Sequence, residues 1–329
     1  MSNLLFIFMI SFSVLVCMSC SSWIVCWMMM EVPPFFLVPI LFGTWSANSS
    51  MIGLKYFIVQ SVGSSIFLFS FMWESFCFAG WEWMSSEKEF GVLVILSLML
   101  KLGVFPFSGW MFHISENLSW KNFFLLSSIQ EVIPLIMISK FGEGGKVITL
   151  FCCVGMTMLV IYCFSNFSIH WMMIISSMFN ICWMMVASLM SKESLFMYML
   201  VYFSMLLILF FFLDMLVSSN SLSSMSSFSL FKEGKVVFIF VSFMVMGMPP
   251  LGSFLGKVEV IRDLVMTGME WVTIYILLVS SIYMYLFLKI SLFSSLSIKK
   301  SWTKGSEKNI WLIGVMIFFS ISFLLFSVF

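Results

Sequence analysis

Residues 98–107, Leu98-Met99-Leu100-Lys101-Leu102-Gly103-Val104-Phe105-Pro106-Phe107, place a lysine, a glycine and a proline together inside an apolar run. A charged ammonium in the middle of a bilayer costs about 2.5–3.5 kcal/mol. A Gly-x-x-Pro sequence interrupts a helix unless neighbouring helices bind the freed backbone groups. The stretch therefore predicts a broken transmembrane helix that presents a protonatable amine to a polar cavity. The alternative is a short helix ending near Lys101, whose amine reaches up to the lipid headgroups.

The composition indicates a membrane protein. Of the 329 residues, 62% are hydrophobic and 9% are charged, and the mean hydropathy is +1.12. So few polar residues could not cover the surface of a soluble domain. The net charge of +1 offers no basic surface for nucleic acid. We recognise no cleavable presequence, and Leu4 onward is expected to be a retained first span.

A requirement of about 20 apolar residues per span predicts eleven transmembrane helices. They cover approximately residues 4–20, 23–42, 51–71, 91–113, 122–139, 147–164, 171–190, 194–217, 235–260, 272–293 and 310–329. These runs are apolar on all faces and longer than the alternating strands of a membrane barrel. We therefore expect an all-α polytopic membrane protein, with residues 1–329 forming a single membrane domain.

Two predicted spans are interrupted at corresponding places. The fourth breaks around Gly103 and Pro106, and the ninth breaks at residues 246–252, Met-Gly-Met-Pro-Pro-Leu-Gly. The breaks lie five spans apart, and an odd-numbered repeat inverts the topology of its copy. Paired interrupted spans of this kind mark the pathway in transporters with inverted repeats. We predict two inverted five-helix repeats, residues 1–140 and 146–293, followed by a last helix at 309–329.

Four ionisable residues stand inside predicted spans: Glu31, Lys101, Glu131 and Lys257. Buried ionisable groups pair, lose their charge or line water. A carboxylate near a desolvated amine opposes loss of the amine's proton, so two bases and two acids supply the parts of a proton relay. The alternative for Glu31 and Glu131 is a carboxylate that serves helix packing only. Lys257 stands nearer the end of its span, and its alternative is an amine that reaches the headgroups.

Lys55 is a weaker relay candidate, because it opens the third span and is equally compatible with an interfacial anchor. The loop lysines gather on the side that holds the N-terminus, whereas an acidic loop at residues 74–89 lies on the other side. The positive-inside rule then places the N-terminus in the compartment of synthesis and the C-terminus opposite.

The eight cysteines do not predict a metal site. Cys17 and Cys20 form one C-x-x-C pair, but no matching Cys or His pair follows at zinc spacing. We expect apolar thiols packed in lipid-facing helices.

Several motifs occur together in the order and spacing of a known family. They are Leu54-Lys55-Tyr56-Phe57-Ile58-Val59-Gln60, Leu100-Lys101-Leu102-Gly103 through Pro106-Phe107 to Trp110, Gln130 through Pro134, and Gly247-Met248-Pro249-Pro250 through Phe254 to Lys257. On these residues the chain resembles, over essentially its whole length, the family of second subunits of mitochondrial NADH–ubiquinone oxidoreductase, respiratory complex I. Its length and span number resemble the shorter animal form.

The resemblance implies an antiporter-like membrane-arm subunit of the mitochondrial inner membrane, with the N-terminus in the matrix and the C-terminus on the intermembrane-space side. It implies that Glu31 pairs with Lys101 and that Lys257 lies on the route towards the next subunit. The implied activity is proton translocation driven by electron transfer from NADH to ubiquinone. NADH, FMN, iron–sulfur clusters and ubiquinone are expected in other subunits, with no cofactor bound by this chain. The implied partners are other membrane-arm subunits and phospholipid, with cardiolipin a candidate.

Three positions depart from the family pattern. Glu131 stands where a central lysine is usual, Ser108 replaces a histidine, and Phe179-Asn180 replaces Asn-His. Either Glu131 is itself the relay group or the channel is altered or inactive. Two alternatives therefore stand beside the pump: a free-standing cation/proton antiporter, and a structural membrane-arm subunit through which no proton passes.

Overall fold

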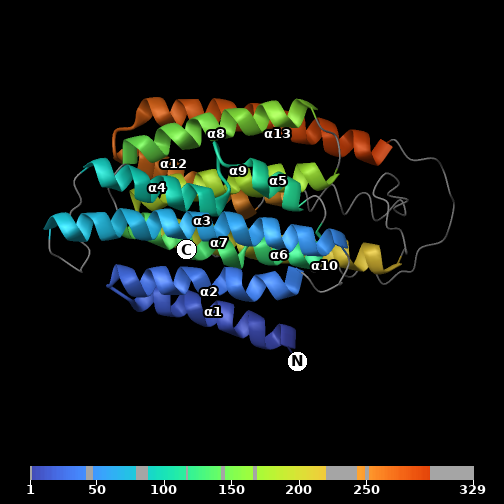
Figure 1. Ribbon diagram of the computed structural model, residues 1–329. Coiled ribbons are helices and arrows are strands. Elements are labelled where there is room, and N and C mark those ends of the chain that lie inside the picture. Colours follow the sequence, from blue (N-terminus) through green and yellow to red (C-terminus); the bar gives the residue numbers. More distant parts are fainter. Residues whose placement is uncertain are drawn as a thin grey trace. The chain divides into compact units, whose positions relative to one another are not determined.

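The computed structural model describes residues 2–41, 47–78, 88–115, 118–141, 145–165, 169–219, 243–248 and 252–296. Regular structure within these residues is α-helical throughout (Figure 1). The labelled helices are α1 (Ser2–Ser19), α2 (Trp23–Leu41), α3 (Ala47–Phe78), α4 (Lys88–Leu102), α5 (Gly109–Ser115), α6 (Trp120–Ser127), α7 (Ile129–Phe141), α8 (Gly145–Ser165), α9 (Ile169–Met190), α10 (Lys192–Ser219), α12 (Gly252–Met266) and α13 (Glu270–Leu296).

The helices have membrane-spanning dimensions. The 19 residues of α2 extend about 28 Å at 1.5 Å per residue, close to the roughly 30 Å of a hydrocarbon core. In the described part of the chain, 7 helical stretches are long and apolar enough to cross a membrane. The predicted all-α membrane fold is confirmed. The total of eleven spans stays a prediction, because the last one, residues 310–329, lies outside the described residues.

The chain divides into two compact units. The first comprises Met1–Gly155 and Ser177–Lys192, and the second comprises Met156–Ser176 and Glu193–Phe329. The predicted repeats, 1–140 and 146–293, stay a prediction, as does the last helix at 309–329.

In the first unit, α7 is the central helix. Helices α1 to α4 pack in sequence order, as Figure 1 shows for α1, α2 and α3, and α7 contacts α1, α2 and α4. Residues 132–138 are all buried, whichever way they face around α7. A helix enclosed on every side has no solvent-facing polar stripe, which is why residues 132–138 are apolar all round.

In the second unit, α12 packs against α13. Gly256 of α12 lies close to Tyr198 of α10, because a Cβ added at this glycine would stand 2.6 Å from a ring carbon. The glycine therefore makes room for the tyrosine ring; small residues where helices pack are typical of membrane proteins, whose helices associate through van der Waals contact.

Both predicted breaks are present, and both are built in the same way. Gly103 and Gly247 have positive φ angles of 70° and 81°. At the first break, Val104 N–H donates to Met99 O at 3.2 Å and Gly103 N–H donates to Leu100 O at 3.2 Å. Residues 243–248 repeat this pattern, with 3.4 Å and 3.3 Å for the same two bonds. These are Schellman motifs, which need the left-handed conformation that glycine adopts at no steric cost.

A third interruption was not predicted. The fifth span is two helices, α6 and α7, separated at Ser128, whose φ of −124° and ψ of −78° are not helical. The Ser128 hydroxyl donates to Phe124 O at 2.6 Å. The sequence here contains neither glycine nor proline, so it gave no local signal. Serine can hydrogen-bond to a carbonyl of the preceding turn and so compete with the helical backbone pattern.

Candidate functional site

The site of the first unit is an ion pair between helices α2 and α4. The Lys101 Nζ atom lies 3.1 Å from the Glu31 Oε1 atom and donates a hydrogen bond to it. The Lys101 side chain is 2% exposed, whereas that of Glu31 is 36% exposed. The structure therefore excludes the reading in which Lys101 reaches out to the headgroups. Charge-assisted hydrogen bonds of this kind are about twice as strong as neutral ones.

The helix break positions Lys101. Because α4 ends at Leu102, its last carbonyls are not used within the helix. Gln60 Nε2 donates to the carbonyl of Lys101 at 3.2 Å, and Trp110 Nε1 donates to the carbonyl of Leu100 at 3.0 Å. Gln60 and Trp110 therefore cap the interrupted helix. A cation is also favoured at this place, because the carbonyl end of a helix carries partial negative charge.

A glycine makes room for the stem of Lys101. A Cβ added at Gly63 of α3 would lie 2.9 Å from Lys101 Cγ. Helix α3 thus contributes Gln60 and Gly63, one turn apart, to the same lysine. Sequence reasoning assigned no role to these two residues or to Trp110. Gln60 and Trp110 stand in the quoted family motifs, and that was the only available signal.

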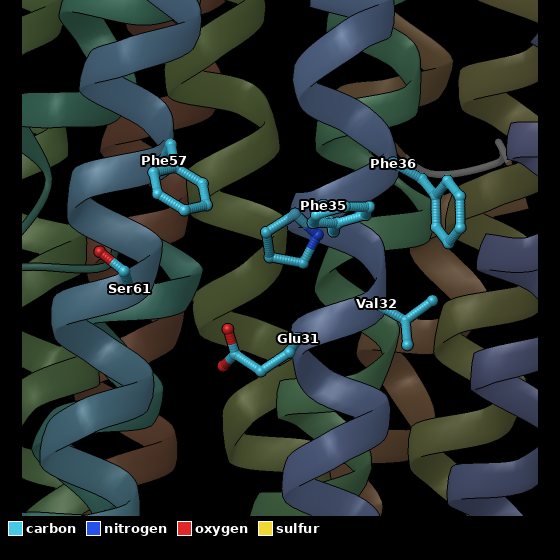
Figure 2. A pocket seen from close by; sticks show the side chains of 7 residues that line it. Glu31, Val32, Phe35, Phe36, Phe57 and Ser61 are labelled. Atoms are coloured by element: carbon cyan, nitrogen blue, oxygen red, sulfur yellow. The ribbon is translucent and has the colours of Figure 1, made fainter.

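The Glu31 side chain contacts both Lys101 and a cavity. Its Oε1 atom accepts from Lys101 inside the unit, while its side chain also lines a cavity of about 380 Å³ between α2 and α3. In Figure 2 the carboxyl group points from α2 towards the helix that carries Phe57 and Ser61. A molecule in this cavity could therefore contact the Glu31 carboxylate from a side that Lys101 does not line.

Glu131 is buried in the central helix α7. Its two carboxyl oxygens have no hydrogen-bond partner among the described residues, and the same holds for Gln130 Oε1 and the Tyr56 hydroxyl. The described structure therefore does not join Glu131 to Lys101 by a direct contact. It places Glu131 on a helix that contacts both α2 and α4. Polar groups left open in a buried position mark a site that a water molecule can complete.

Lys257 belongs to the second unit and is buried at the second break. Its Nζ atom donates to Met246 O at 2.5 Å, and Ser253 Oγ donates to Met244 O. A Cβ added at Gly247 would lie 2.8 Å from the Lys257 Nζ atom, so the glycine is needed for this contact as well as for its φ angle. Lys257 does not reach out to the headgroups, which removes that alternative too.

Two other lysines lie outside the ion pair. Lys55 is exposed on α3. Lys140, nine residues beyond Glu131, donates to Cys17 O at 2.7 Å and to Cys20 O at 2.6 Å, so it caps the carbonyl end of α1.

The described cysteines are free thiols, most of them buried. Cys17, Cys26, Cys152, Cys163 and Cys182 are buried, as the expected packing of apolar thiols requires, while Cys20 and Cys153 are partly exposed. Among the described residues, no group of three or more His, Cys, Asp or Glu side chains could hold a metal ion.

Comparison with known proteins gives matches over most of the chain. A family model described as NADH:quinone oxidoreductase/Mrp antiporter, TM, matches residues 20–283. The NADH-ubiquinone oxidoreductase chain 2 of Anopheles gambiae is 30% identical over 333 residues, which are 94% of this chain and 91% of that protein.

Two solved structures share the fold. A chain of respiratory complex I from Thermus thermophilus has a TM-score of 0.80 at 14% identity, covering 98% of this chain and 77% of that one. A chain of the Mrp complex from Dietzia sp. has a TM-score of 0.76 at 15% identity, covering 92% of this chain and 62% of that one.

Proposed function

The chain belongs to the NADH:quinone oxidoreductase/Mrp antiporter family of membrane proteins, and from this membership we propose that it is a proton-translocating, antiporter-like subunit in the membrane arm of an NADH–ubiquinone oxidoreductase. Its similarity to chain 2 of the mosquito enzyme over nearly the full length supports this assignment. In the proposed complex, electron transfer from NADH to ubiquinone occurs in other subunits, which hold the FMN, the iron–sulfur clusters and the quinone.

The observation that carries the proposal is the Glu31–Lys101 pair beside an interrupted helix. An ion pair in a low-dielectric interior is strongly coupled, so a change of charge on either member changes how firmly the other holds its proton. A partner subunit that draws the Glu31 charge away, or supplies a new one, would make Lys101 release or accept a proton. Because this chain uses charge alone, it needs no redox centre of its own.

Glu131 and Lys257 are the proposed further stations of the relay. Glu131, Gln130 and Tyr56 each hold a buried oxygen without a hydrogen-bond partner among the described residues of the first unit. In the proposed relay, water bound beside these oxygens extends the path from the ion pair. Lys257 provides a second amine at an interrupted helix. Exposed Lys55 is left out of the relay and assigned to the membrane interface.

The proposed location is the mitochondrial inner membrane. The loop charges favour the N-terminus on the matrix side and the C-terminus on the intermembrane-space side. The flanks of the helices are then covered by other membrane-arm subunits and by phospholipid, with cardiolipin a candidate.

The test is Lys101→Met in the assembled complex, with Lys55→Met as the matched control. Proton translocation coupled to NADH oxidation should fall at least tenfold in the first variant and stay within about twofold in the second. A Lys101→Met complex that assembles and pumps normally would overturn the proposal in favour of a structural subunit. Gradient-driven Na⁺ or K⁺ flux by the isolated chain in liposomes would instead support the free-standing antiporter.

A further inference from the structure

The cavity beside Glu31 has the construction of a small-molecule site. Its volume is about 380 Å³, within the usual range for ligand pockets. Its wall is formed by Glu31, Val32, Pro34, Phe35, Phe36, Phe57 and Ser61. Six of these seven side chains are labelled in Figure 2, where the rings of Phe35 and Phe57 both lie above the Glu31 carboxyl group, which points towards the helix that carries Ser61. The site is thus apolar, with one acid.

The polar atoms of the pocket wall that can still form hydrogen bonds are acceptors. Glu31 Oε1 already accepts from Lys101, while its second oxygen keeps its acceptor capacity. The Ser61 hydroxyl donates to Ile58 O at 2.9 Å within its own helix, which leaves the oxygen lone pairs to accept. A ligand here must bring donors.

We propose that this pocket binds a lipophilic organic cation, with its ammonium or amidinium head at Glu31 and its apolar body between the phenylalanine rings. The carboxylate supplies charge complementarity. Aromatic faces also attract a cation that lies within about 6 Å of the ring centre. A neutral molecule of the same shape would gain the apolar contacts alone.

The position of the pocket along the membrane-spanning helix distinguishes a small membrane-dissolved cation from a lipid headgroup. Glu31 stands near the middle of α2, which runs from Trp23 to Leu41. Its distance from the start of the helix is about 12 Å at 1.5 Å per residue. A lipid headgroup stays near the interface, so the occupant is a small amphiphile dissolved in the membrane rather than a phospholipid amine.

Occupation of the pocket acts directly on the ion pair. The ligand's cation and the Lys101 ammonium would share one carboxylate, and like charges at such distances repel each other. A bound cation therefore disfavours the charged form of Lys101, and a charged Lys101 weakens binding of the cation. The binding itself does not rest on the proposed proton translocation, because the pocket and its acid are present whichever function the chain has.

The test is photolabelling of membranes that carry the assembled complex. The probe is 3-(4-azidophenyl)propylamine, and its neutral counterpart is 3-(4-azidophenyl)propanol. Peptide mapping should find the amine probe on residues 31–36 and 57–61, with at least tenfold less label from the alcohol. The Glu31→Gln variant should remove this difference between the two probes. Label mainly on other segments, or equal labelling by both probes, would overturn the proposal.

A matched serine pair controls for folding. Ser61 and Ser65 both stand on α3, and each donates at 2.9 Å to a carbonyl three residues earlier, but only Ser61 lines the pocket. Ser61→Leu fills part of the cavity and should reduce amine labelling by at least tenfold. Ser65→Leu should leave it within twofold. Equal labelling of the two variants would overturn the proposal even if Glu31→Gln failed to assemble.

Discussion

Replacing Gly63 by alanine tests whether the position of Lys101, rather than its mere presence, matters to the protein. The change adds one methyl group to α3 and alters neither charge nor hydrogen bonding. Its carbon would lie 2.9 Å from Lys101 Cγ and 3.1 Å from Leu100 Cδ2. Because non-bonded carbon atoms prefer about 3.5–4.0 Å, the lysine stem must retreat by about 0.6–1.1 Å.

The expected effect on stability is small, and the expected effect on function is large. Overpacking costs about 1–3 kcal/mol, while alanine in place of glycine contributes about 1 kcal/mol to a helix. The net loss of folding free energy should therefore be about 0–2 kcal/mol. A displacement near 1 Å moves Lys101 Nζ away from its 3.1 Å contact with Glu31. Misplacing a reacting group by this amount can cost on the order of 10²-fold in rate.

The assay compares proton translocation coupled to NADH oxidation with the thermal stability of the same assembled complex. Gly145→Ala is the control, since its added carbon would lie 3.9 Å from Leu189, an ordinary contact. We expect Gly63→Ala to slow translocation at least tenfold with little change in thermal midpoint, and Gly145→Ala to change neither. Normal translocation in Gly63→Ala would refute the argument, as would an equal loss in both variants.

Three further substitutions test the remaining parts of the site. Gln60→Leu removes the donor to the Lys101 carbonyl and should destabilise the complex by about 1–3 kcal/mol, measured as a lower thermal midpoint; an unchanged midpoint would show that the cap at 3.2 Å contributes nothing. Lys257→Met should reduce proton translocation at least tenfold, whereas Lys289→Met, at an exposed position of α13, should not; equal effects would remove Lys257 from the relay. Lys140→Met should loosen α1, seen as faster proteolysis near residues 17–20, but leave translocation normal; lost translocation in a stable complex would make Lys140 a relay base.

The relation between sequence and site differs from residue to residue. Lys101 and Lys257 were recognisable because each charge stands in an apolar run that also holds a helix-breaking glycine, two residues after Lys101 and ten before Lys257, which is a local pattern. The pairing of Lys101 with Glu31 joins residues 70 positions apart, and it was expected only through resemblance to a family. Glu131 was selected by its position in a span, yet its lack of a partner among the described residues could not be foreseen. Lys55, the weaker candidate at the start of the predicted third span, is exposed.

The sequence by itself determined the helical membrane fold and the two glycine breaks, because hydropathy over one span and the φ requirement of one residue are properties of a short segment. The tertiary structure alone decided which side chains meet at a break. Gln60 and Trp110 cap the end of α4, Lys140 caps α1 from more than a hundred residues away, and Glu31 opens to a cavity between two helices. Buried polar groups find their partners across helices. Which helix faces meet depends on packing across the whole bundle, and no single segment encodes it.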